Sequence, residues 1–171
     1  MDNVYKIKKK LKLPMSLATV ISIPVFADVV MQGYQTSILV MAVILMILFY
    51  LLTINNLLRK VRITDNEVSI RGITGLRRLP IEDISFIDGI TMGTRQFISL
   101  SSKKRNYLIP NSFENFPDIV SALEQIAKEG TLGDGIKALK ENIIVRKSDI
   151  TGAWITVILL LIIILVRFFP R

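Results

Sequence analysis

Three long apolar stretches divide the chain. They run from Leu13 to Met31, from Ser37 to Ile54 and from Ala153 to Phe169. A helix that crosses the hydrocarbon layer of a bilayer needs roughly 20 residues, or about 17 at the short end. The loop between the first two stretches is short, which suits two antiparallel helices. The pattern therefore predicts a transmembrane helical hairpin over residues 13–58 and a third transmembrane helix over residues 150–171.

Between the second and third apolar stretches the pattern changes to a period of two. Segments such as RKVRIT, EVSIRG and RQFISL alternate apolar and polar positions, and turn signals such as Asp65-Asn66 separate them. Alternation of this kind is typical of β-strands that bury one face. We expect about six short antiparallel strands that bend into a small barrel or sandwich. Pro80 cannot donate to a ladder, so it marks an edge strand or a bulge.

A helical period follows the last of these strands. Pro117 suits the first turn of a helix, and Gly130 is a natural stop at its end. The apolar residues that share one face of this helix are Phe113, Phe116, Ile119, Val120, Leu123, Ile126 and Ala127. So wide an apolar face must be buried against the sheet. The sequence predicts an α+β domain over residues 59–130, closed by a C-terminal helix.

Two segments flank these elements. Residues 1–12 are expected to form a basic cytoplasmic tail. Residues 131–149 are expected to form a connector, in which Ile136 and Leu139 fit a short amphipathic helix that lies on the membrane or on the β-domain. The glycine-rich sequence GTLGDG, residues 130–135, has neither the lysine spacing of a P-loop nor a Rossmann pattern, so it predicts no nucleotide site.

The distribution of Lys and Arg predicts the orientation in the membrane. Five lysines precede the first apolar stretch, Arg59, Lys60 and Arg62 follow the second, and Arg146-Lys147 precede the third, whereas the loop QGYQTS has no positive charge. Basic loops stay in the cytoplasm. The N-terminus and the middle domain are therefore expected inside, and the C-terminus outside, in a multi-pass protein of the cell (inner or plasma) membrane. A signal peptide cleaved after Ala27 is the competing interpretation.

Composition narrows the possible functions. The chain is 51% hydrophobic with a mean hydropathy of +0.49, which is typical of membrane proteins. It has no cysteine and no histidine, so thiol chemistry, imidazole bases and Cys or His metal sites are excluded. We expect no enzyme activity and no cofactor. The net charge is +8, but residues 59–150 carry 15 Lys and Arg against 12 Asp and Glu, with no basic stripe, so nucleic acid is not an expected partner.

The combined pattern resembles the bacterial pleckstrin-homology-like (PH-like) domains of small membrane proteins. The segments that carry the resemblance are VRITDNEVSIRG, RRLPIEDISFIDG and NSFENFPDIVSALEQI. The resemblance implies a β-barrel or sandwich closed by a helix, acting as an interaction or assembly module. Two departures are six strands in place of seven and a third apolar stretch after the domain. Phosphoinositide recognition is not carried over, because the first turn, Asp65-Asn66-Glu67, is acidic.

Two groups of residues are candidate sites. Lys103, Lys104 and Arg105 lie at a predicted hairpin tip, where they fit either contact with lipid phosphates or an acidic partner, or a solvated turn. Asp28 is the one acidic residue in an apolar stretch, one turn from its outer end, where it fits either an interfacial position or a proton or cation site. Arg77 and Arg78 are expected on opposite faces of a strand, at the surface.

These observations predict a membrane-anchored interaction or scaffold module. Its expected partners are membrane lipids together with a protein partner or further copies of itself. The alternative is a subunit of a transport or ion-conducting assembly that uses Asp28.

Overall fold

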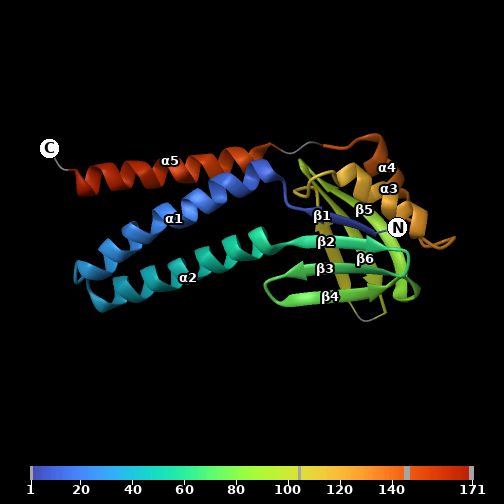
Figure 1. The fold of residues 1–171 in the computed structure, drawn as a ribbon, viewed down its shortest axis with the longest axis horizontal. Helices are drawn as coiled ribbons and strands as arrows, with labels where there is room; N and C mark the ends of the chain where they lie inside the picture. Colours follow the sequence, from blue (N-terminus) through green and yellow to red (C-terminus); the bar gives the residue numbers. More distant parts are fainter. Residues whose placement is uncertain (1, 104, 145–146, 170–171) are drawn as a thin grey trace. The chain divides into compact units, whose positions relative to one another are not determined.

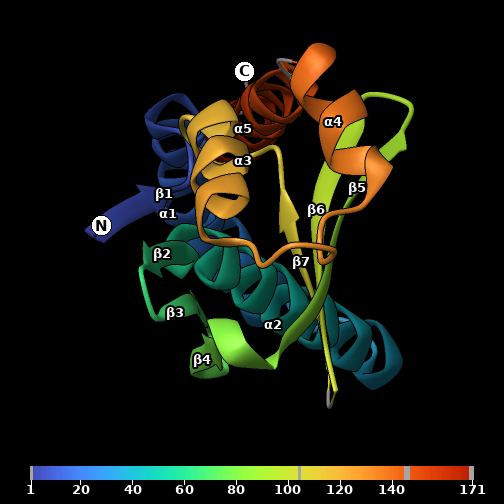
Figure 2. The ribbon, with the colours of Figure 1, turned by 90° about the vertical axis from the view of Figure 1, so that its right-hand side faces the viewer.

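The computed structural model describes residues 2–103, 105–144 and 147–169. The chain forms two compact units (Figures 1 and 2). The helical unit consists of Lys9–Leu58 and Lys147–Arg171, and the α+β unit consists of Met1–Lys8 and Arg59–Arg146. Each unit is therefore built from segments that are far apart in the sequence.

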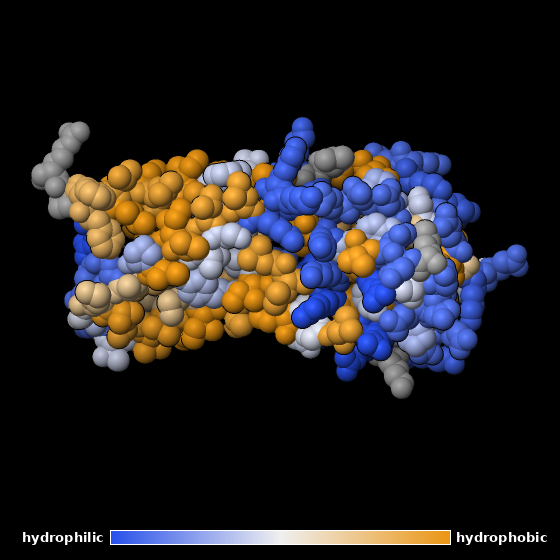
Figure 3. Space-filling view, in the orientation of Figure 1, coloured by the Kyte–Doolittle hydropathy of each residue, from blue (hydrophilic) through white to orange (hydrophobic). Residues whose placement is uncertain are grey.

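The helical unit contains α1 (Lys9–Met31), α2 (Thr36–Leu58) and α5 (Ser148–Phe168). All three are long and apolar enough to cross a membrane, as the sequence predicts. The face of these helices drawn in Figure 3 is mostly hydrophobic. No aqueous domain leaves so large an apolar surface in water, so this surface fits a hydrocarbon environment.

Helix α1 packs against both α2 and α5. Its buried positions recur every three or four residues and include the small side chains of Ala18 and Ser22. Small residues let neighbouring helix backbones approach closely. The hydroxyls of Ser22 and Tyr50 lie 3.0 Å apart in a hydrogen bond that links α1 to α2. The ring of Phe26 lies against that of Tyr50, with centroids 6.1 Å apart.

The α+β unit contains two antiparallel sheets. The first has the order β1-β2-β3-β4, formed by Asp2–Lys6, Lys60–Thr64, Glu67–Gly72 and Gly75–Pro80. After a short 3-10 turn, η1 (Ile81–Asp83), the second has the order β5-β6-β7, formed by Ile84–Met92, Arg95–Ser102 and Asn106–Pro110. All six strands expected after residue 59 are present, and Pro80 lies in an edge strand. The described strands form two open sheets and no closed barrel.

Strand β1 differs from the expected basic tail. Asp2 to Lys6 pair with Thr64 to Lys60, and the alternation buries Tyr5 and Ile7. Beyond the strand, Ile7 forms a bridge with Phe113, and both side chains are only 1% exposed. The N-terminal residues are thus part of the α+β unit, and α1 and α2 are inserted between two of its neighbouring strands.

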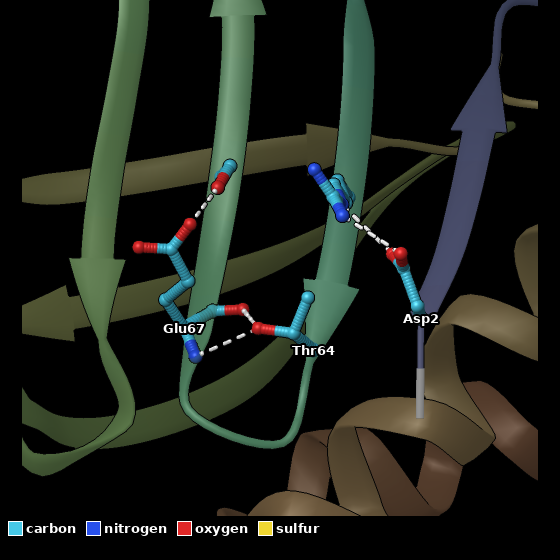
Figure 4. Close-up of polar contacts among 5 residues, drawn as sticks. Asp2, Thr64 and Glu67 are labelled. Atoms are coloured by element: carbon cyan, nitrogen blue, oxygen red, sulfur yellow. Dashed lines mark hydrogen bonds and ion pairs between the residues drawn. The ribbon is translucent and has the colours of Figure 1, made fainter.

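An ion pair on the exposed face joins β1 to β2. Arg62 donates from Nε and Nη2 to the two carboxylate oxygens of Asp2, each at 2.7 Å (Figure 4). The hydrogen bond from Arg62 holds the pKa of Asp2 below its usual value. A lowered pKa means that the folded state favours the carboxylate. The pairing therefore stabilises the fold at neutral pH, and this contribution is lost as the pH falls through the lowered pKa.

Helix α3 (Phe116–Ile126) supplies much of the core of this unit. Phe116, Ile119, Val120 and Leu123 are all 3% exposed or less, as the sequence predicts. They are buried together with inward residues of both sheets, among them Val61, Ile63, Ile98 and Leu100. The helix ends at Ile126 because Ala127 is extended, so Gly130 lies beyond the stop rather than forming it.

The predicted connector is mostly part of the α+β unit. Helix α4 (Asp134–Glu141) packs on β5, with Ile136 and Leu139 each 1% exposed. Residues 131–133 run beside β5, where Ile87 donates to Thr131 O at 2.7 Å and accepts from Gly133 N at 2.8 Å. The domain therefore continues well past residue 130.

The glycine-rich sequence before α4 has a packing role. A Cβ atom on Gly135 would lie 2.2 Å from the carbonyl oxygen of Gly89, so only glycine fits at this approach of α4 to β5. Asp88 Oδ1 accepts from the backbone N–H of Gly135 at 3.0 Å. This carboxylate caps the N-terminus of α4 from a neighbouring strand.

Two buried amides hold the segment that leads to α5. Gln96 donates to Asn142 O at 2.6 Å and accepts from Ile144 N at 2.8 Å. Asn111 donates to Ile144 O at 3.1 Å. Both amide side chains are at most 2% exposed, so breaking these bonds would leave polar groups buried without partners.

The first prediction tests whether the N-terminal residues belong to the core. Ile7→Ala should destabilise the α+β unit by about 2–5 kcal/mol, because it removes most of a fully buried side chain. Val4→Ala is the matched control, since Val4 is 53% exposed on the same strand. Hydrogen exchange of the β2 and β3 amides measures the difference. Equal exchange in the two variants would show that β1 does not support the core.

Candidate interaction groove

A groove of about 410 Å³ lies in the α+β unit, where the end of β4 approaches the turn between β6 and β7. Four short pieces of chain line it, from β4, η1, β6 with its turn, and β7. The lining residues are Arg78, Leu79, Pro80, Asp83, Ser102, Lys103, Arg105 and Tyr107. The predicted hairpin tip therefore lines the same groove as Arg78, which belongs to the other sheet.

Ser102 shapes the tip. Its backbone N–H donates to Arg105 O at 3.0 Å, and its hydroxyl donates to the same oxygen, also at 3.0 Å. The hydroxyl oxygen also accepts a hydrogen bond from the backbone N–H of Arg105 at 3.3 Å. These bonds close a tight turn and fix the backbone on which Lys103 and Arg105 are carried. Lys104, the third residue of the predicted cluster, lies outside the described residues.

The groove is cationic with an apolar component. Arg78, Lys103 and Arg105 are exposed, and among the residues with described positions none forms an ion pair with them. Tyr107 is half-buried and offers apolar surface beside the cations, whereas Leu79 is buried beneath them. Guanidinium groups bind carboxylates and phosphates in a bidentate manner. The arrangement therefore suits an extended acidic segment that also carries an apolar side chain.

Arg77 takes no part in this groove, as strand alternation predicts. Its Nη2 donates to Thr74 Oγ1 at 3.1 Å, near the turn at the other end of β4. The sequence placed Arg78 at the surface but gave no sign that it lies beside the tip, because β4 and the β6–β7 turn belong to different sheets. Within the described parts of the chain, no three acidic, His or Cys side chains are grouped to hold a metal ion.

Asp28 belongs to a different site, within the helical unit. Its Oδ2 accepts from Arg167 Nε at 2.9 Å and from the side-chain amide of Gln32. Asp28 lies in the last turn of α1 and Arg167 in the last turn of α5. The two helices therefore run parallel, which the expected three-span topology requires. The carboxylate joins two helix ends by a charged hydrogen bond.

An apolar crevice of about 520 Å³ lies near Asp28 along α1 and α2. Its lining is almost entirely hydrophobic and consists of Ile23, Phe26, Ala27, Val30, Met31, Met46 and Tyr50. A conducting path for ions needs polar groups or water along its length. This crevice suits hydrocarbon rather than an ion.

Comparison with known proteins found no matching family model, no matching curated protein and no matching solved structure. The fold itself defines the class: an α+β chain with three helices that are long and apolar enough to cross a membrane. The PH-like nature of the domain stays a prediction.

The second prediction concerns the Asp28–Arg167 pair. Asp28→Asn should lower the thermal stability of the protein in nanodiscs, because it leaves the Arg167 cation without its carboxylate. The double variant Asp28→Asn/Arg167→Gln should be more stable than the single one, since no unpaired charge remains. Additive losses in a double-mutant cycle would show that the two side chains do not stabilise each other.

Proposed function

We propose that this chain is a membrane-anchored interaction module of the PH-like kind, which acts at the cytoplasmic face of the cell membrane. One observation carries the proposal. A folded β-rich domain is joined at three points of the chain to helices apolar enough to span a bilayer, and it carries a groove whose cations form no ion pair with described residues. Such a domain is available to bind a protein partner or a second copy of itself beside the membrane.

The strand count supports the PH-like assignment. The sequence offered six strands where the full pleckstrin fold has seven, and β1 brings the described number to seven. A helix, α3, follows the last strand, as the resemblance implies. The domain would then be a seven-stranded module with a helical hairpin inserted after its first strand.

The sheet edges favour the groove as the binding element. Residues 131–133 cover part of β5, and the edge strand β4 carries Pro80 together with the two arginines Arg77 and Arg78. Strand β7 is short and ends in Pro110. Proline and charge at an edge discourage the addition of another strand. The partner would therefore present an acidic segment to Arg78, Lys103 and Arg105.

Transport through the helices, the alternative function, has less support. It relied on Asp28, whose carboxylate is occupied by Gln32 and Arg167 in the described structure. The apolar crevice beside it offers no polar path. The interaction module is therefore the function that we put forward.

The third prediction tests the groove. A photo-crosslinking side chain in place of Tyr107 should capture partner protein in native membranes. Arg78→Glu/Arg105→Glu should remove these adducts, because each hydrogen bond to a charged group contributes about 1.5–3 kcal/mol and two are lost. Arg95→Glu is the matched control, since Arg95 is exposed at the start of β6 outside the groove. Adducts that persist in the double variant, or vanish in the control, would rule out the groove.

The fourth prediction concerns topology. A reporter fused after residue 130 should be active only in the cytoplasm, and one fused after residue 171 only outside. Exchange of these two results would reverse the proposed orientation. An intact N-terminus is also expected, because cleavage after Ala27 would remove Tyr5 and Ile7 from the core. Intact-mass spectrometry of the purified protein distinguishes a chain that starts at Met1 from one that starts at Asp28.

A further inference from the structure

We infer that one end of the first sheet is a contact surface for anionic lipid headgroups. This surface, here called the lipid-facing end, consists of Lys6, Lys60 and Arg71, with Ile73 in the β3–β4 turn and Leu76 at the start of β4. The inference rests on the membrane anchoring in the proposed function, and is independent of the partner bound by the groove.

The register of the strands assembles the three cations. Lys6 pairs with Lys60, and Lys60 pairs with Arg71. Side chains at directly opposed positions of an antiparallel sheet point to the same face. Lys6, Lys60 and Arg71 therefore form one row across β1, β2 and β3. A groove of about 240 Å³ runs along this face, with Lys60 and Arg71 at one end and Glu67 at the other.

This row lies where the chain enters and leaves the apolar helices. Helix α2 ends at Leu58, two residues before Lys60, and helix α1 begins at Lys9, three residues after Lys6. Two residues of chain span at most about 7 Å. Whatever the arrangement of the two units, the backbone of Lys60 must lie close to the end of a helix that crosses the membrane.

The β3–β4 turn brings apolar side chains to the same end of the sheet. Strand β3 runs from the turn at Asp65-Asn66 toward this end of the sheet. Gly72, the residue after Arg71, pairs with Gly75. Gly75 has a φ of +100°, which lets the chain reverse tightly. Ile73 is 40% exposed and Leu76 is 53% exposed. Exposed aliphatic side chains beside cations are typical of surfaces that enter the bilayer interface.

The charge pattern distinguishes this end from the opposite one. Lys6, Lys60 and Arg71 have no ion-pair partner among the side chains that the structure describes. Asp2 and Glu67 lie at the other end of their strands, where Asp2 binds Arg62 and Glu67 accepts from Ser69 at 2.9 Å (Figure 4). The groove around Lys103 and Arg105 also lies at that other end, next to Pro80. The row of Lys6, Lys60 and Arg71 is therefore a better candidate than the predicted hairpin tip for binding lipid phosphates.

The test uses the absence of cysteine, which makes single-site labelling specific. The full chain carrying Ile73→Cys is spin-labelled and placed in nanodiscs of phosphatidylcholine with or without phosphatidylglycerol. Asn66→Cys is the matched control, because it lies in the exposed turn at the opposite end of the same sheet. We expect the label at position 73 to become accessible to oxygen and shielded from aqueous nickel only with phosphatidylglycerol. The label at position 66 should stay aqueous in both.

A second pair of variants tests the cations. Lys60→Gln/Arg71→Gln should lower the ratio of docked to undocked labels at position 73 by about fivefold per cation, since each basic residue near an anionic surface contributes about 1 kcal/mol. Lys103→Gln/Arg105→Gln should leave the ratio unchanged. Unchanged exchange of the β2 amides verifies that the variants are folded.

Three results would overturn the inference. They are an aqueous label at position 73 in anionic nanodiscs, equal burial in phosphatidylcholine alone, and shielding that appears only when cytosolic protein is added. The last would assign the surface to a protein partner. Inorganic phosphate in solution should not shield the label, which separates a lipid surface from a free anion. Variants that lose partner adducts at the groove should leave the accessibility of the label at position 73 unchanged. The partner groove and the lipid-facing end can therefore be refuted independently of each other.

Discussion

The pairing of β1 with β2 is the constraint on which the rest of the structure depends. These strands are direct neighbours in the sheet, yet α1 and α2 lie between them in the sequence. Since Lys6 is opposite Lys60, the chain must leave and return at the same end of the sheet. Two antiparallel helices satisfy this requirement, and the hydrogen bond between Ser22 and Tyr50 links them.

The connection from the domain to α5 is also held, by hydrogen bonds to buried side chains. Before the chain reaches α5, the buried amides of Gln96 and Asn111 bind the backbone of Asn142 and Ile144. At the first connection, Lys8 N donates to Ser112 O at 3.2 Å, and Glu114 N donates to Lys6 O at 2.8 Å. Hydrogen bonds thus hold the described residues on the domain side of both connections.

Features set by local pattern could be predicted from the sequence, and those set by distant partners could not. The hairpin around Asp65-Asn66 and the buried face of α3 follow from spacing within a dozen residues. Strand β1 was missed because Lys6 and the four lysines that follow the strand resemble a topology signal, and because its partner strand follows the helical hairpin. The same holds for Asp88 capping α4, for Arg78 beside the tip, and for the Asp28–Arg167 pair. In each of these the two groups lie far apart in the chain, and only the fold reveals that they meet.

In the proposed function, one end of the first sheet contacts lipid and the groove at the other end binds the partner. Lys6, Lys60 and Arg71 are scattered through the sequence, so no basic stripe is visible there, yet the register gathers them at the end of the sheet where the chain continues into α1 and arrives from α2. With α1 and α2 in a membrane as proposed, docking of this end would be intramolecular, and a few weak charge contacts would be enough to bias it. Docking of that end would leave the groove at the opposite end, with Arg78 and Arg105, exposed to the cytoplasm. A domain held in this orientation would present its cationic groove to partners while its own lipid contacts keep it from turning over.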